Sequence, residues 1–87
     1  MYLPLKIEIF KEGDVFVAVS PELNVSSFGD SVEEASASLR EAVDAFIEEC
    51  REMGTLDEVL EEAGFSRTEE RWEPRKPIFE DNLSISF

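Results

Sequence analysis

Residues 25–54 read VSSFGDSVEEASASLREAVDAFIEECREMG, and this stretch decides the fold because a strand, a helix start and a long helix follow one another in it. Residues 25–28 predict a short strand. Gly29-Asp30-Ser31 is typical of a helix start, with Asp30 or Ser31 as the N-cap, and Glu34 completes a capping box with Ser31. We therefore expect a helix to begin directly after the end of a strand.

The residues after this start follow the period of an amphipathic helix. Apolar residues recur at spacings of three and four, and they predict one buried stripe: Val32, Ala35, Leu39, Ala42, Val43, Phe46, Cys50 and Met53. Gly54 lies where such a helix should end, since glycine readily adopts the left-handed conformation of a C-cap. We expect the stripe to pack across one face of a sheet.

The preceding residues supply the other strands of that sheet. Every second residue from Leu3 to Ile9 is leucine or isoleucine, which predicts a half-buried strand. Residues 15–20 alternate in the same way, and the Lys-Glu-Gly-Asp sequence between the two runs predicts an antiparallel hairpin. Pro21 ends the second strand because proline has no N–H to donate to a ladder.

The rest of the chain predicts a shorter helix and a last strand. Residues 55–65 predict the helix, after which Phe65 is expected to return to the core. Residues 66–77 show neither period and contain two prolines, so we expect a loop or extended connection. In residues 82–87, Leu, Ile and Phe alternate with polar residues, which predicts a C-terminal strand that docks on a sheet.

These elements predict one small α+β domain over residues 1–87. The expected order is β-β-β-α, then a short helix and a C-terminal strand, with the long helix on one face of an antiparallel sheet. Residues 1–54 form the core, residues 55–65 the short helix, and residues 66–87 the loop and last strand. A chain of 87 residues with 43% hydrophobic residues supports a single modest core.

The charge of the chain restricts its partners. Eight Lys and Arg against 21 Asp and Glu give a net charge of -13, which disfavours direct binding to nucleic acid or to anionic membranes and favours a basic partner. Charges at Lys6, Glu8 and Lys11 interrupt the N-terminal apolar residues, so we expect neither a signal peptide nor a membrane span. Cys50 is the single cysteine, and this agrees with a cytoplasmic protein.

The residue types disfavour catalysis. The chain has no histidine, so it lacks the commonest general base and the commonest nitrogen ligand for transition metals. Cys50 lies on the apolar stripe and is expected to be inert, while the four glycines fall at turns or helix ends and form no phosphate-binding loop. A site for a hard cation would have to come from helix carboxylates expected to be solvated: Glu48, Glu49, Glu52, Asp57, Glu58, Glu61 and Glu62. We expect no enzyme activity, no cofactor and no metal site.

Aromatic residues are the candidates for contact with a partner. Phe10, Phe16 and Phe28 are expected on the strand faces opposite the valine and leucine stripe, where they either line an association surface or form core beneath the last strand. Trp72 is either a lid on the core or an interface anchor. The basic residues near it are offset by three glutamates, so the segment does not predict a nucleic-acid site: Arg67, Arg71, Arg75 and Lys76.

Residues 21–49 resemble the sequence pattern of the HicB antitoxin family. The resemblance depends on the spacing of eight residues: Pro21, Glu22, Leu23, Gly29, Asp30, Ser31, Glu34 and Ala35. Together with the hairpin it covers about residues 3–50. Two features depart from the family: the chain goes directly from Leu23 to Asn24-Val25, without the proline-glycine-cysteine sequence of many members, and nothing after Gly54 suggests the DNA-binding domain of longer members.

The resemblance implies a fold, a partner and a function. The fold is a partial ribonuclease-H-like arrangement used for binding, and the partner is a HicA toxin, a small basic ribonuclease that cleaves messenger RNA with a histidine. The implied function is neutralisation of that toxin by an oligomeric antitoxin, expected here to be a dimer. Two alternatives stay open: an orphan homo-oligomeric domain with another partner, and a metal-dependent nuclease, for which only Glu8 and Asp14 lie on or beside the strands.

Overall fold

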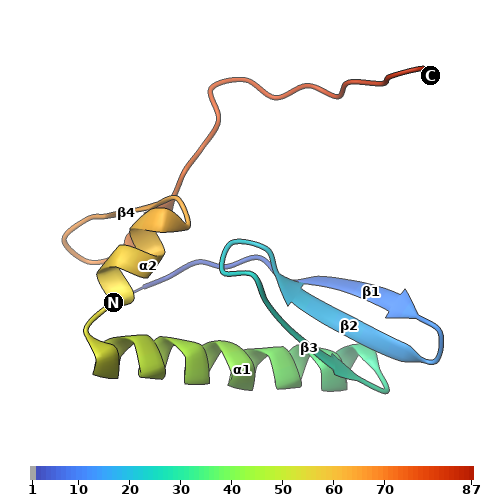
Figure 1. Cartoon of the computed structure of the whole chain (residues 1–87), viewed down its shortest axis with the longest axis horizontal. Coiled ribbons are helices and arrows are strands. Elements are labelled where there is room, and N and C mark those ends of the chain that lie inside the picture. The colour runs from blue at the N-terminus through green and yellow to red at the C-terminus, as the bar shows by residue number, and fades with distance from the viewer. Residues whose placement is uncertain (1) are drawn as a thin grey trace.

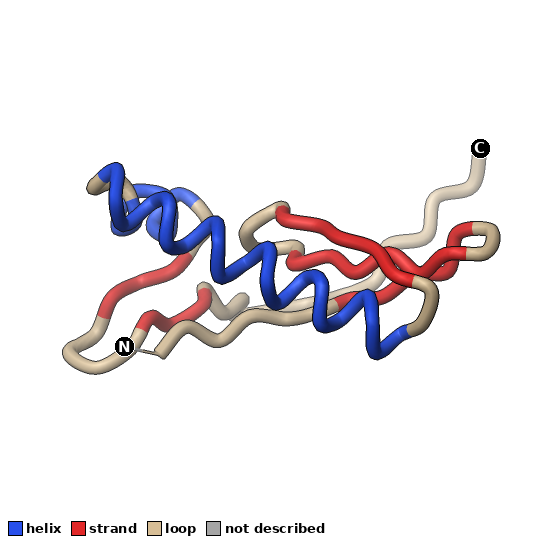
Figure 2. Tube along the Cα trace, turned by 90° about the horizontal axis from the view of Figure 1, so that it is seen from below, coloured by secondary structure: helices blue, strands red, loops and turns tan. Residues whose placement is uncertain are grey.

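The computed structural model describes residues 2–87, which form five strands and two helices (Figure 1). Strands β1 (Glu8–Glu12), β2 (Val15–Ser20) and β3 (Val25–Gly29) make an antiparallel sheet in the order β1-β2-β3. Helix α1 (Val32–Met53) runs along one face of this sheet (Figure 2). The α+β class and the placement of the long helix are confirmed.

The second part of the chain is a smaller unit packed at the end of α1. It contains helix α2 (Leu56–Glu62) and a two-stranded antiparallel sheet of β4 (Phe65–Arg67) and β5 (Trp72–Pro74). The expectation of a loop over residues 66–77 was therefore partly wrong. Pro74 is accommodated because it is the last residue of a two-stranded ribbon, where a missing donor costs little.

The register of the large sheet decides which residues face the helix. Ile9, Ala18 and Ser27 lie opposite one another on the helix side, and Ala18 is fully buried. The next row, on the other side, joins Phe10, Val17 and Phe28. The alternation predicted for the hairpin is present, but β1 begins only at Glu8.

The late start of β1 corrects the strand expected from Leu3. Glu8 pairs with Val19 near the end of β2, and Pro21 follows directly after β2, so residues 3–7 join no ladder. Tyr2 forms an isolated parallel bridge with Arg71, just before β5. Residues 3–7 remain extended and pack Leu3 and Leu5 against the core. The alternation of apolar and polar residues in this segment therefore reflects an extended chain with one side against the core, and not a strand paired along its length.

Helix α1 starts and ends as the sequence predicts. Ser31 is the N-cap, and its Oγ accepts a hydrogen bond from the Glu34 N–H at 3.0 Å. Gly54 ends the helix in the left-handed conformation at φ 72°, and its N–H donates to the Arg51 carbonyl at 3.1 Å. Of the two N-cap candidates, Ser31 is confirmed.

Among residues 2–87, two clusters of buried residues form the core. Ala18, Ala35 and Leu39 pack between the sheet and α1. The second cluster joins residues from both parts of the chain: Leu23, Leu60, Phe65 and Trp72. Phe65 returns to the core as expected, and Cys50 is buried with 7% of its surface exposed.

The C-terminal residues do not form the expected strand. Residues 75–87 lie outside every helix and strand and leave the body beyond β5 (Figure 1). Leu83, Ile85 and Phe87 are exposed because no strand lies beside them to complete a ladder. The sequence left open whether this segment would pair within its own chain or across a dimer, and within this chain it forms no strand.

Neither of the helices described over residues 2–87 combines the length and the apolar composition that a membrane-spanning helix requires.

Candidate interaction surfaces

The residues of the HicB-like motif build the corner between β3 and α1. A Cβ on Gly29 would lie 2.5 Å from the Ala35 backbone nitrogen and 2.8 Å from the Glu34 carbonyl carbon, so only glycine fits there. Ala35 is fully buried against Ala18, and a larger side chain would separate helix from sheet. Asp30 is exposed beside Ser31, and the structure gives it no capping hydrogen bond.

The first half of the motif forms the turn between β2 and β3. Leu23 is buried in the second core cluster, and Asn24 adopts a positive φ of 56°. The Glu22 carboxylate accepts from the Lys6 backbone N–H at 3.2 Å, which holds the N-terminal segment against the turn. The motif therefore has a clear structural role, and its buried members are not available to a partner.

The helical side of the molecule carries a surface of unpaired carboxylates. All the acids of residues 30–64 are exposed: Asp30, Glu33, Glu34, Glu41, Asp44, Glu48, Glu49, Glu52, Asp57, Glu58, Glu61 and Glu62. Only Asp57 has an ion-pair partner among the described residues, Arg67 at 3.2 Å. The other eleven acids lack such a partner within residues 2–87, so their charge is free to act on another molecule.

Six of these acids form a ridge along α1. At 100° per residue, Glu33, Glu34, Glu41, Asp44, Glu48 and Glu52 fall within about a 100° arc on the side away from the buried Ala35 and Leu39. The ridge from Glu33 to Glu52 is about 28 Å long at the rise of an α-helix. We call these six residues the acidic ridge.

The outer face of the large sheet is apolar at its centre. Phe10, Val17 and Phe28 lie in register across β1, β2 and β3, and the two phenylalanines are 52% and 69% exposed. A shallow hollow of about 590 Å³ lies beside Phe28 and is lined by Val15, Val17, Ser26 and Ser27 as well. A solvated sheet face normally carries polar residues, so this row is a candidate contact surface.

Phe16 is not part of this surface. It lies on the helix side of β2, packs against the core around Ala18, and has the Lys11 ammonium 5.9 Å from its ring. Each phenylalanine lies opposite the apolar stripe of its own strand, as expected, but the three do not form one surface. The register places Phe16 on the helix side and Phe10 and Phe28 on the other side, beside Val17. Val17 was missed, since only the pairing of the three strands reveals its neighbours.

Trp72 is buried with 3% of its surface exposed, in contact with the second core cluster. Of the two alternatives, core lid and interface anchor, the burial of Trp72 in this chain agrees with the core lid. The Arg67 guanidinium lies 5.9 Å from its ring and also binds Asp57. Arg71 is near Glu73 at 3.9 Å, so half of the basic cluster already has an acidic neighbour.

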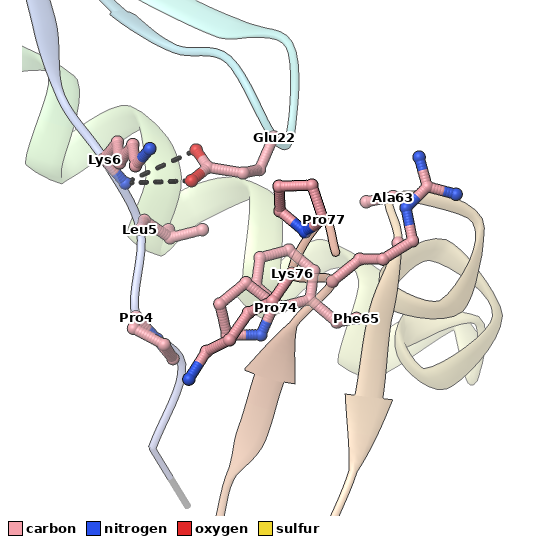
Figure 3. Close-up of a pocket in the computed structure, with 11 residues that line it drawn as sticks. Pro4, Leu5, Lys6, Glu22, Ala63, Phe65, Pro74, Lys76 and Pro77 are labelled. Atoms are coloured by element: carbon pink, nitrogen blue, oxygen red, sulfur yellow. Dashed lines mark hydrogen bonds between the residues drawn. The ribbon is translucent and has the colours of Figure 1, made fainter. Parts of the chain in front are cut away.

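The other half of the basic cluster lines a pocket at the junction of the two parts (Figure 3). This pocket of about 520 Å³ lies between the N-terminal residues Pro4 to Lys6, Glu22, and the residues around Pro74 to Pro77. Arg75, Lys76 and Lys6 bring positive charge to it, and Glu22 brings the one carboxylate. The pocket also shows that the C-terminal residues leave the body beside Glu22.

Carboxylates do not converge in the described part of the chain. Within residues 2–87, no three His, Cys, Asp or Glu side chains are placed to hold a metal ion together. Glu8 and Asp14, the strand carboxylates of the nuclease alternative, are both exposed. Nothing in this arrangement favours that alternative.

Comparison with protein-family models, with curated proteins and with solved structures finds no match to this chain. The resemblance to HicB antitoxins therefore depends on the sequence motif alone.

Proposed function

We propose that this chain is a non-catalytic binding protein that neutralises a small basic HicA-like ribonuclease by covering its RNA-binding and catalytic surface. The observation that carries the proposal is the acidic ridge: six exposed carboxylates in one row, none with an ion-pair partner among residues 2–87. The HicB-like motif at residues 21–35 supports the same function, and a partial ribonuclease-H-like fold is the scaffold that it implies. We place the protein in the cytoplasm, where messenger RNA is cleaved.

The acidic ridge suits a partner that normally binds RNA. Such a partner recognises a row of phosphates with Lys and Arg, and much of its affinity comes from charge. The ridge offers a row of negative charges over about 28 Å on a rigid helix, and it has no phosphodiester bond that a ribonuclease could cleave. A toxin bound to it is occupied by an uncleavable substitute for its substrate.

The opposite charges of the two partners raise the association rate and fix the orientation of the complex more than they raise its affinity. An exposed ion pair contributes about 0–1 kcal/mol, whereas complementary potentials raise the association rate and disfavour the wrong orientation. We therefore expect fast association that slows steeply as salt is added.

The test is co-purification with a small basic protein encoded beside this chain. The wild-type chain should bind that protein at about 150 mM salt and block its cleavage of RNA. The variant Glu41→Lys/Asp44→Lys/Glu48→Lys should lose both properties. The control Glu69→Lys/Glu70→Lys/Glu80→Lys changes the net charge equally outside the helices, at exposed acids, and should keep both.

If both variants lost binding and inhibition equally, the net charge of the chain, and not the acidic ridge, would account for toxin binding. The absence of a basic neighbour, or failure of the wild-type chain to co-purify with it, would refute the antitoxin function.

The alternative is an orphan homo-oligomeric domain with another partner. The observation that favours it is the exposed row of Phe10, Val17 and Phe28, which provides an apolar surface without any toxin. Genome context separates the two functions, because the orphan domain requires no toxin gene beside its own.

A further inference from the structure

We propose that residues 82–87 of one copy pair as a fourth strand with the free edge of β3 in a second copy, and that the exchange is reciprocal. The product is a symmetric dimer in which each copy both donates and accepts a strand. This inference does not depend on the toxin, because both partners are copies of this chain.

The donor segment has the composition of a strand and no partner in its own chain. Leu83, Ile85 and Phe87 are 85%, 68% and 117% exposed, and they alternate with Asn82, Ser84 and Ser86. The six residues carry no charged side chain and no proline. A single strand gains neither ladder hydrogen bonds nor buried area, so these residues gain stability only by joining a sheet.

The acceptor edge is β3. The sheet order β1-β2-β3 leaves β1 and β3 as its edges. Strand β1, EIFKE, carries three charged side chains, which protect an edge against addition of another strand. Strand β3, VSSFG, carries none.

Addition at β3 extends the apolar row on the outer face of the sheet. Leu83, Ile85 and Phe87 lie on one face of a strand, and beside β3 they can flank Phe28, which lines the hollow of about 590 Å³. The row Phe10–Val17–Phe28 then continues onto a fourth strand. Addition of a strand to an exposed edge is a common mode of peptide recognition.

The geometry of the connection favours a second copy over the same chain. Pro77 and Glu22 line one pocket (Figure 3). Because Glu22 comes three residues before Val25, where β3 begins, the segment leaves the body near the start of β3. The five residues of β3 extend about 17 Å, a distance that residues 78–82 would already cover in extended form. Pairing within the chain would place Glu80 and Asp81 beside β3 and residues 83–87 beyond its end.

Charge favours the same contact. Two copies, each with a net charge of -13, repel one another over most of their surfaces. Both β3 and residues 82–87 are free of charged side chains, so they are places where two copies can approach closely.

Native mass spectrometry and light scattering of the full chain test the exchange. The wild-type chain should be a dimer. Leu83→Glu/Ile85→Glu should raise its dissociation constant by at least about 100-fold, because charge would enter the apolar face of the added strand. Ser84→Glu/Ser86→Glu places the same charge on the alternate face and should remain dimeric. All four positions are exposed, so circular dichroism of each variant should match that of the wild type.

A second pair of variants identifies the edge. Phe28→Glu on β3 should weaken the dimer, whereas Phe10→Glu, two strands away in the same row, should leave it intact. Equal weakening by both would show that two outer faces pack together, and would overturn strand exchange. A monomeric wild-type chain, or a dimer unaffected by Leu83→Glu/Ile85→Glu, would overturn it as well.

Discussion

Gly29 is the residue on which the corner between β3 and α1 depends. A Cβ there would lie 2.5 Å from the Ala35 nitrogen, in contact with helix backbone that cannot rotate away. We expect Gly29→Ala to lower the free energy of unfolding by about 2–3 kcal/mol, since relief requires the helix to move off the sheet. Urea unfolding of the wild type and of Gly29→Ala measures this change in the free energy of unfolding.

Gly13→Ala is the matched comparison for this glycine. Gly13 lies in the hairpin turn at φ 60°, with nothing within 4 Å of an added Cβ. Gly13→Ala should lower the free energy of unfolding by only about 1 kcal/mol, the cost of holding a residue with a Cβ in the left-handed conformation. If the two alanine variants lost the same stability, the close approach at Gly29 would not be what matters there.

Ser20 is a buried polar residue whose hydroxyl has no hydrogen-bond partner among residues 2–87. Its side chain is 1% exposed. We expect Ser20→Ala to stabilise the chain by about 1 kcal/mol, because the cost of desolvating the hydroxyl disappears. Thermal and urea unfolding measure the change, with the exposed Ser26→Ala as a control that should stay within about 0.5 kcal/mol of wild type. A destabilised Ser20→Ala would show that the hydroxyl has a partner in solution.

At the scale of elements, the best-predicted unit is α1. Its caps are local in sequence, so the expected limits agree with the observed Val32–Met53. The apolar stripe is buried along its middle, while Val32 and Met53 at its two ends are exposed. The start of β1 was predicted less well, because a strand needs a partner and the β1–β2 ladder begins only at the pair Glu8–Val19. The partner of residues 82–87 could not be predicted for the same reason, because alternation identifies the capacity to pair but not the molecule that provides the edge.

The candidate surfaces also divide into those that local sequence predicts and those that depend on contacts between distant residues. The acidic ridge was foreseeable, since its six positions follow from helical spacing. The row Phe10–Val17–Phe28 was not, because the sequence distance between strands does not give their register. Trp72 could be assigned to the core only once Leu23 and Leu60 were seen beside it.

The N-cap of α1 provides a test at this scale. Ser31→Ala removes the hydrogen bond to the Glu34 N–H and should cost about 1 kcal/mol of stability. Asp30→Ala, one residue earlier, removes a charge near the positive helix end but no cap, and should cost no more than about half as much. Thermal unfolding of the two variants decides which residue caps the helix. A larger effect of Asp30→Ala would contradict the observed cap.

At the scale of the whole molecule, the charge of -13 opposes folding and favours binding to a basic partner. The acids of residues 30–64 are exposed and, except for Asp57, unpaired among the described residues, so they repel one another along the helices. Two small core clusters must hold the chain together against this repulsion. Added salt should therefore stabilise the free chain but weaken its complex with a basic partner.

We expect the melting temperature of the free chain to rise by a few degrees when sodium chloride increases from about 10 mM to about 150 mM. The Debye length falls from about 30 Å to about 8 Å over this range, which screens repulsion along the acidic ridge but leaves the apolar contacts nearly unchanged. The charge-reversed variant Glu41→Lys/Asp44→Lys/Glu48→Lys carries less repulsion and should show a smaller rise. Over the same range, the affinity for a basic toxin should fall, because its attraction to the ridge is screened too. A free chain whose stability does not respond to salt would mean that the ridge acids do not repel one another, and the charge argument for the partner would lose its physical basis.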